Sequence, residues 1–480
     1  NFLFEACNII RGPVSQDNFK DYITPLLYYK RISDVYDEET EEALISSGGD
    51  KEYASLPEQH RFVIPDGCHW QEVRERTENL GAAIVGAMRQ IEIANPDTLY
   101  GVLSMFSSQK WTNKAILNDS KIRDLIEHLS KRKLGNKDYP ADLMGDAYEI
   151  LLKKFADDSK AQAGEFYTPR SVVRLLVHIL DPQPGETVYD PACGSGGMLI
   201  EAIRYMHDDS LCCGSIFGQE KNVVNAAIAK MNLFLHGASD FNVMQGDTLR
   251  DPKILQGGNI AKFDCVIANP PFSLENWGAT EWSSDKYKRN IYGTPSDSCG
   301  DYAWIQHMIC SMSSGKGRMA VVMPQGILFR GNQEAEIRKQ LVESDLIEAV
   351  VTLGDKLFYG TGLSPCFLII RRMKQAHHSG RILMIDGSKI LTQKRAQNIL
   401  EENDIDRLYS LYQNYSDEED YSRIVTLQEI RDKEYNLSPN RYVVYHKEEI
   451  RPYAEVLAEF KQAYADVKRL ENEFSLLINA

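Results

Sequence analysis

The stretch Asn269-Pro270-Pro271-Phe272 constrains this chain more than any other feature, because it directly follows the apolar run from Phe263 to Ala268. That run has the composition of a strand buried on both faces, which is typical of parallel sheets. Two consecutive prolines cannot continue a hydrogen-bonded ladder, so the strand must end at Asn269. The sequence therefore predicts an amide, a rigid turn and an aromatic ring at the carboxyl end of a strand, where open α/β sheets bind ligands.

This arrangement suits the methylation of an exocyclic amine on a nucleobase. Such a nitrogen is a poor nucleophile because its lone pair is delocalised into the ring. We expect the Asn269 side-chain oxygen and the Pro270 carbonyl each to accept one N–H, which orients the amine and concentrates electron density on nitrogen. Pro271 completes the rigid turn, and Phe272 is expected to stack on the base. The alternative interpretation is a purely structural turn.

A glycine-rich turn stands about 75 residues upstream, at the end of a second predicted strand, in the run Asp190-Pro191-Ala192-Cys193-Gly194-Ser195-Gly196-Gly197. Its glycines allow close approach of the backbone to a ligand. Leu199 occupies the place of the third glycine in the dinucleotide fingerprint, so the turn does not match a dinucleotide-binding site. The turn resembles the nucleoside-binding turn of S-adenosylmethionine-dependent methyltransferases. The resemblance implies a cofactor site at Gly194, Ser195, Gly196 and Gly197, with Asp190 orienting the turn and the methionine amino group.

Three further segments extend this cofactor site. Glu220 ends the next predicted strand, where an acid typically accepts hydrogen bonds from ribose hydroxyls, and Asp247 ends the third, where it could accept from the cofactor's adenine amine. A solvated carboxylate is the alternative for each. Thr168 is expected to cap a helix over Ser171–Leu180. The segment before that helix resembles the cofactor-binding opening of adenine methyltransferase domains, which implies contacts from Glu165, Phe166, Tyr167, Thr168, Pro169 and Arg170.

The order of these motifs resembles the modification (M) subunit of type I restriction-modification systems, as do the segments Tyr22–Asp34, Arg318–Gly331 and Leu357–Gly362. The resemblance implies transfer of a methyl group from S-adenosyl-L-methionine to N6 of an adenine flipped out of double-stranded DNA. It also implies three kinds of partner: a specificity (S) subunit, a second M subunit and a restriction (R) subunit that holds the nuclease. No GxxxxGK[ST] phosphate loop occurs in this chain.

Other substrates and roles stay open at this point. Related motifs serve methylation of cytosine N4, of guanine N2 in ribosomal RNA and of glutamine in release factors, and a catalytically silent assembly subunit is a further alternative. Cys193 does not indicate carbon-5 cytosine chemistry, because Asn-Pro-Pro stands where a Pro-Cys pair would be needed.

Composition agrees with a reduced, cytoplasmic protein without a membrane segment or metal site. The nine cysteines show no CxxC spacing, and no apolar run approaches 18 residues. The net charge of −15 and pI near 5.3 do not fit a chain that grips DNA over a broad face. We therefore expect that a partner supplies much of the DNA contact.

The expected fold class is α/β: a doubly wound, Rossmann-like methyltransferase sheet with an N-terminal helical domain and a C-terminal helix. Apolar runs near residues 187, 216, 242, 264, 319, 348 and 366 alternate with helical patterns. We expect a helical domain over 1–155, the catalytic domain over 156–400, an extension over 401–451 and a partner-docking helix over 452–480. Apolar residues recur at heptad spacing in that last segment, at Val456, Phe460, Ala463, Val467, Leu470, Phe474 and Leu477. A helix packed on its own domain is the alternative.

The segment 273–300 is long and polar, with aromatic and basic residues interleaved. Such a loop beside the active-site motif suits an extruded base and a strand backbone, and we expect it to become ordered on DNA. The alternative is a surface insertion with incidental charges.

Overall fold

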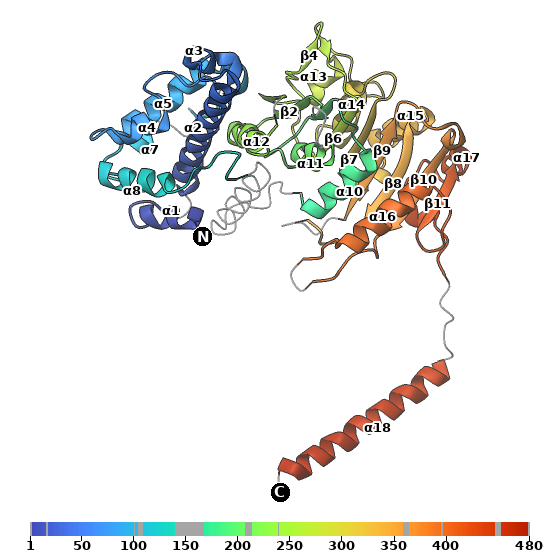
Figure 1. Cartoon of the computed structure of the whole chain (residues 1–480). Helices are drawn as coiled ribbons and strands as arrows, with labels where there is room; N and C mark the ends of the chain where they lie inside the picture. Colours follow the sequence, from blue (N-terminus) through green and yellow to red (C-terminus); the bar gives the residue numbers. More distant parts are fainter. Residues whose placement is uncertain are drawn as a thin grey trace. The chain divides into compact units, whose positions relative to one another are not determined.

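The computed structural model describes residues 2–15, 18–99, 101–103, 109–139, 168–206, 214–238, 240–358, 364–394, 397–446 and 453–478. They fall into two compact units, residues 1–443 and residues 444–480 (Figure 1). Within these ranges no helix is both long and apolar enough to cross a membrane.

The N-terminal part of the first unit is helical. Its α-helices are α1 (Phe2–Ile10), α2 (Lys20–Ser46), α3 (Lys51–Ala54), α4 (Trp70–Arg74), α5 (Leu80–Ala94), α6 (Pro96–Leu99), α7 (Gln109–Thr112) and α8 (Asp119–Ser130). Their apolar faces share one core, which also takes in Met231, Phe234 and Leu235 from a helix of the following sheet region. The long helical pattern of Gln71–Ile91 covers two helices, because Asn79 adopts a left-handed backbone with φ of 54° immediately before α5.

A nine-stranded sheet forms the rest of the first unit. Its strands are β1 (Val188–Asp190), β2 (Ile216–Glu220), β3 (Phe241–Gln245), β6 (Cys265–Ala268), β7 (Arg318–Pro324), β8 (Ile347–Leu353), β9 (Pro365–Arg371), β10 (Arg381–Gly387) and β11 (Ser422–Thr426). They lie in the order β11-β10-β8-β9-β7-β6-β1-β2-β3. The pairs from β3 to β7 are parallel, whereas β9 runs antiparallel to both β7 and β8. A separate small hairpin joins β4 (Leu255–Gln256) to β5 (Asn259–Ile260).

Alternate residues along each strand face opposite layers, as strand geometry requires. On β6, Cys265 and Ile267 enter one core, whereas Val266 and Ala268 enter the other. Helices cover both faces, at α10 (Arg170–Leu180), α11 (Gly197–Met206), α12 (Val223–Leu235), α13 (Ala279–Ser283), α14 (Asp301–Ser311), α15 (Gln333–Glu343), α16 (Glu402–Asn414) and α17 (Leu427–Asp432). The predicted doubly wound α/β class is confirmed, and all seven predicted strands are present.

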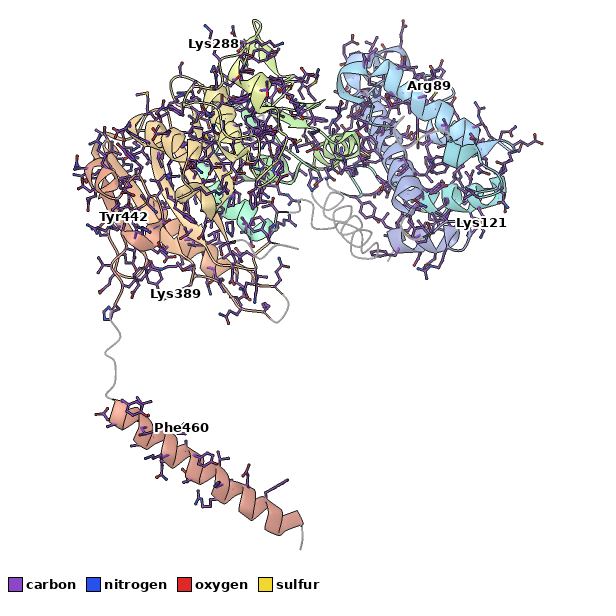
Figure 2. The ribbon with its side chains drawn as sticks, turned by 180° about the vertical axis from the view of Figure 1, so that it is seen from behind. Arg89, Lys121, Lys288, Lys389, Tyr442 and Phe460 are labelled. Carbon is purple, nitrogen blue, oxygen red and sulfur yellow. The ribbon has the colours of Figure 1, made fainter. Side chains whose placement is uncertain are left out.

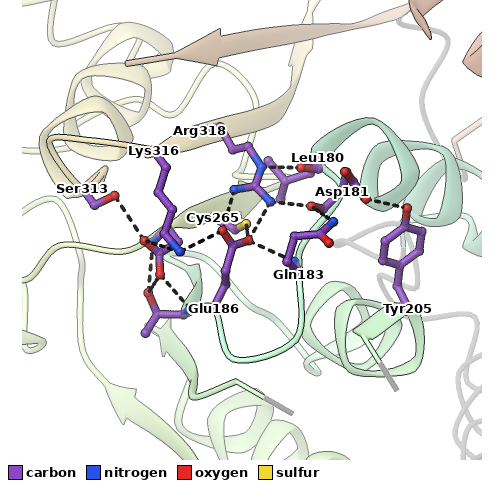
Figure 3. Close-up of polar contacts among 11 residues, drawn as sticks. Leu180, Asp181, Gln183, Glu186, Tyr205, Cys265, Ser313, Lys316 and Arg318 are labelled. Carbon is purple, nitrogen blue, oxygen red and sulfur yellow. Dashed lines mark hydrogen bonds and ion pairs between the residues drawn. The ribbon is translucent and has the colours of Figure 1, made fainter. Parts of the chain in front are cut away.

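The amino edge of this sheet is held by a buried ion pair between Glu186 and Arg318 (Figure 3). The two side chains are 2.7 Å apart, and the residues are 5% and 7% exposed. Lys316 lies 3.2 Å from the same carboxylate. Burial raises the pKa of Glu186, but the hydrogen bonds from Arg318 and from the Gln183 N–H outweigh it and lower the pKa to about 2.

Replacing Arg318 by Met should lower the free energy of unfolding by about 3–5 kcal/mol at pH 7, because Glu186 is left as a buried, poorly compensated charge. The pKa of Glu186 is lower in the folded chain than in the unfolded one, so the pair stabilises above about pH 4.5. That stabilisation is lost as pH falls from there towards about 2. Urea titrations across this range should show the difference between variant and wild type shrinking. Arg431→Met, which breaks the exposed pair with Glu343, is the control and should have little effect.

The described residues of the second unit form one helix, α18 (Tyr453–Ile478). Its heptad residues from Val456 to Phe474 are solvent-exposed, with 66% of Phe460, 57% of Leu470 and 64% of Phe474 accessible. Figure 2 shows the Phe460 side chain projecting from this helix.

Candidate active site

Five parallel strands bring the predicted site residues to one edge of the sheet. In the order β3-β2-β1-β6-β7 all carboxyl ends lie on the same side. Asp190 ends β1, Glu220 ends β2, and Asn269 follows β6 directly. Residues up to 79 positions apart in the chain therefore lie at one edge of the sheet, as their places at the strand ends predicted.

The Asn269 side chain is fixed through its nitrogen, which donates a 2.8 Å hydrogen bond to Thr168 Oγ1. Its oxygen is buried and has no hydrogen-bond partner among the described residues. A buried acceptor left without a donor costs about 1–3 kcal/mol, so such atoms tend to serve a ligand. The amide is thus oriented to present a free acceptor at the strand end.

The prediction that Thr168 caps the helix after it is wrong. The helix cap is Pro169 rather than Thr168, and α10 begins at Arg170. The Thr168 hydroxyl instead accepts the hydrogen bond from the Asn269 amide. The two residues are 101 positions apart in sequence, so local helix signals could not predict this contact. Glu165, Phe166 and Tyr167 lie outside the described residues, and Arg170 faces Glu201 at 4.0 Å.

Phe272 lies in an aromatic pair. Its ring centroid is 6.4 Å from that of Phe358, with the ring planes at 55°. Phe358 is 8% exposed and precedes a segment outside the described residues. The sequence contains Phe358 in one of the family-like segments but gave no reason to place it against Phe272.

The glycine-rich turn has the backbone that its sequence predicts. Gly194 and Gly196 have φ of 53° and 87°, values that favour glycine, and Gly197 begins α11. Asn232 of α12 donates a 2.8 Å hydrogen bond to the Ser195 carbonyl, which ties the turn to the neighbouring helix. The Gly194 N–H donates to Glu220 at 3.0 Å, so the first two strand ends are linked.

Two carboxylates face this turn, of which Asp190 is buried and Glu220 is half-buried. Asp190 is 2% exposed and accepts a 2.9 Å hydrogen bond from the Ala192 N–H. The pKa of Asp190 is raised to about 8, mainly by burial and also by the Glu220 charge, against the hydrogen bond from the Ala192 N–H, which lowers it. Burial also raises the pKa of Glu220, against hydrogen bonds from the N–H groups of Asn222 and Gly194. A ligand that brings positive charge and hydroxyl donors would relieve both groups.

Asp247 has protein partners on both carboxylate oxygens. Oδ2 lies 2.9 Å from Lys221 Nζ, and Oδ1 accepts a 3.2 Å hydrogen bond from the Arg250 N–H. It follows β3 and is 23% exposed along its side chain.

The segment 273–300 is folded in the protein alone, which corrects the expectation that DNA orders it. Trp277 and Trp282 are each 2% exposed and pack edge to face, and Arg289 is 1% exposed. Arg289 pairs with Asp285 and donates to the carbonyls of Thr248 and Leu249. These aromatic and basic side chains anchor the segment to the sheet; Lys288, by contrast, is exposed at its surface (Figure 2).

A charged cluster that no sequence pattern predicted lies beside the Asn-Pro-Pro-Phe turn. Asp301 is fully buried at the start of α14 and accepts a 2.7 Å hydrogen bond from the Ser273 N–H. Its other oxygen accepts from Arg330 at 2.9 Å. Cys299 and Glu334 complete a group with metal-ligating atoms, but Arg330 contacts both of them as well. The guanidinium therefore stands where a cation would be held, and the cluster joins the β7 loop to the catalytic-type turn.

Comparison with known proteins identifies the family of this chain. The N-6 DNA Methylase family matches residues 139–450, and the HsdM N-terminal domain matches residues 1–129. The type I restriction enzyme MjaVII methylase subunit of Methanocaldococcus jannaschii is 35% identical over 93% of this chain and 78% of its own length. The HindI methylase subunit of Haemophilus influenzae is 31% identical over 79% of this chain and 84% of its own length.

A solved type I restriction-modification methyltransferase subunit from Streptococcus thermophilus superposes with a TM-score of 0.78. It is 25% identical and covers 93% of this chain and 98% of that one. Fold and site thus define a DNA methyltransferase that acts on an exocyclic amine. The chain belongs to the N-6 DNA methylase family, as a methylase subunit of a type I restriction-modification system, and it methylates N6 of adenine in DNA.

Proposed function

We propose that the Asn269 oxygen and the Pro270 carbonyl hold the two N–H groups of a flipped adenine. The observation that supports this is the buried Asn269 oxygen without a partner among the described residues, on an amide that Thr168 fixes. The flipped ring would stack on Phe272, whose partner Phe358 keeps it in place. Flipping costs a few kcal/mol, which binding contacts offset.

We propose S-adenosyl-L-methionine as the methyl donor, held by the glycine-rich turn. This cofactor supplies a methyl group on a sulfonium, which an amine nitrogen can displace directly, with the thioether as leaving group. Asp190 and Glu220 would accept hydrogen bonds from its ammonium and ribose hydroxyls. Burial raises the pKa of both groups because it destabilises the carboxylate form, and a bound cation or hydroxyl donor would stabilise that form. Residues 165–170 and Asp247 complete the proposed site.

Catalysis by this chain would consist of positioning and exclusion of water. Asn269 and Pro270 orient the adenine nitrogen and share its developing positive charge. The proton leaves nitrogen after transfer, so no strong base is required at the strand end. This agrees with a site whose carboxylates face the glycine turn rather than the amide.

We further propose that DNA recognition is shared with other subunits. The chain carries a net charge of −15, so an S subunit would supply much of the grip on double-stranded DNA, with a second M subunit and an R subunit completing the assembly. We assign residues 1–155 to a helical domain, 156–400 to catalysis, 401–451 to an extension and 452–480 to docking on the S subunit.

The function is tested by transfer of labelled methyl groups to DNA with and without the S subunit, followed by digestion to nucleosides. N6-methyladenine that forms only with the partner supports the whole proposal. N6-methyladenine from this chain alone would show that it recognises DNA itself, and α18 would then need another role. Label on another base would contradict the assigned chemistry.

The docking role of α18 predicts that Phe460→Ala with Leu470→Ala weakens binding of the S subunit. These side chains are 66% and 57% exposed, so the change should leave the rest of the chain intact. Loss of two buried anchors typically costs more than about 2 kcal/mol of binding. Calorimetry or co-purification would measure it, with Lys461→Ala and Lys468→Ala, two exposed residues away from the heptad stripe, as the matched control. Equal affinity of both double variants would exclude docking through this stripe.

A further inference from the structure

Phe329 is the one exposed Phe, Tyr or Trp side chain among the described residues of 168–446. It is 54% exposed and follows the short 3-10 turn Gln325–Leu328 at the carboxyl end of β7. A lone exposed apolar residue usually needs no explanation. Phe329 differs because of how its loop is held and what that loop adjoins.

The loop is fixed by hydrogen bonds on either side of Phe329. The Gly326 carbonyl accepts from the N–H groups of Phe329 and Arg330, at 3.2 and 2.9 Å. Three more carbonyls of the loop accept hydrogen bonds. The Ile327 carbonyl accepts from the Tyr302 hydroxyl and from Arg338, the Leu328 carbonyl accepts from the Leu437 N–H, and the Arg330 carbonyl accepts from Arg338. A Cβ on Gly326 would lie 2.3 Å from Arg330 Nε, so the glycine makes room for the guanidinium. The backbone is thus rigid while its aromatic side chain faces solvent.

The loop also adjoins the catalytic-type turn. Arg330 donates to Asp301, and Asp301 accepts from the N–H of Ser273, the residue after Phe272. β6 and β7 are parallel neighbours, paired at Ala268 and Val321, so both loops leave the same edge of the sheet. The loop that carries Phe329 is therefore linked through Arg330 and Asp301 to the turn that carries Phe272, at the same edge of the sheet.

We propose that Phe329 enters the DNA base stack beside the flipped adenine and fills part of the space that it vacates. Extruding a base leaves unstacked neighbours, and apolar side chains inserted at such steps recover part of the lost stacking. A side chain carried by a loop with a fixed backbone loses less conformational freedom on insertion than one on a mobile loop. DNA is the occupant that the position favours, because any protein covering Phe329 would lie where the duplex has to approach Asn269.

The inference rests on the proposed role of Asn269, and its test separates the two. Phe329→Ala in the complex with the S subunit should lower methyl transfer to a matched duplex by roughly 5- to 150-fold, the range for loss of one base–aromatic stack. A duplex with a mismatch opposite the target adenine is already weakened there, so the same variant should lose much less on it. 2-Aminopurine at the target position should report less unstacking in the variant.

Met373→Ala is the matched control, because Met373 is 72% exposed and follows β9 at the opposite edge of the sheet. It should leave both substrates unaffected. If Phe329→Ala lowers methyl transfer equally on matched and mismatched DNA, insertion of Phe329 into the base stack is excluded. If the variant binds the S subunit more weakly, Phe329 belongs to a protein contact instead. Wild-type failure to methylate either duplex would instead count against the proposed function.

Discussion

Asn269→Ala should reduce methyl transfer to adenine by about 10²–10³-fold, the usual cost of removing one preorganised hydrogen-bond partner of a transition state. The loss should fall on kcat, because the Asn269 oxygen would contact the amine most strongly as charge develops on nitrogen. Single-turnover assays with labelled cofactor and a DNA duplex would measure it. Cofactor affinity, followed by calorimetry, should be nearly unchanged, since Asp190 and the glycine turn lie on other strands.

Thr168→Val distinguishes positioning from contact with the substrate. The substitution keeps the shape of the side chain but removes the hydroxyl that accepts from Asn269. The amide would then be free to rotate, so transfer should fall by less than in Asn269→Ala. Wild-type turnover in Asn269→Ala would end the proposed role of the amide, whereas wild-type turnover in Thr168→Val would show that packing alone orients it.

The parts of the fold that the sequence predicted depend on local patterns. Apolar runs that end at prolines, glycines or acids located β1, β2, β3, β6, β7, β8 and β9, because a buried strand has a distinct composition, whereas the short hairpin of β4 and β5 was not predicted. The reversed direction of β9 carries no such signal. β9 is as apolar as its neighbours, yet it lies between β7 and β8 and runs antiparallel to both. β10 and β11 were missed, and β11 pairs antiparallel at the edge with mixed burial.

The parts of the site that the sequence missed depend on contacts between distant residues. Interleaved aromatic and basic residues at 273–300 suggested DNA contact, but Trp282 lies beneath the Arg289 guanidinium at 4.4 Å, as a buried cation–π pair. Composition cannot tell an exposed tryptophan from a buried one when both occur in a polar segment. Asp301 gave no signal either, because its partners Ser273 and Arg330 stand 28 and 29 residues away.

Asp301→Asn should lower kcat by about 10²-fold, because loss of the correct geometry at a reacting centre by about 1 Å has that effect. Both oxygens of Asp301 accept hydrogen bonds, from the Ser273 N–H and from Arg330. An asparagine has one oxygen and one NH₂ group, so one of these donors must face another donor whichever way the amide turns. The turn after Phe272 or the β7 loop would then shift.

Glu334→Gln is the matched control for Asp301→Asn. Glu334 contacts the same Arg330, at 3.0 Å, but none of its hydrogen bonds in the described part of the chain reaches the catalytic-type turn. Both variants remove one negative charge next to Arg330, and only Asp301→Asn releases Ser273. Cofactor titration checks that each variant is folded. If the two variants lose activity equally, the charge around Arg330 matters rather than the anchoring of Ser273; if only Asp301→Asn loses it, a buried carboxylate that touches neither base nor cofactor sets the geometry of methyl transfer.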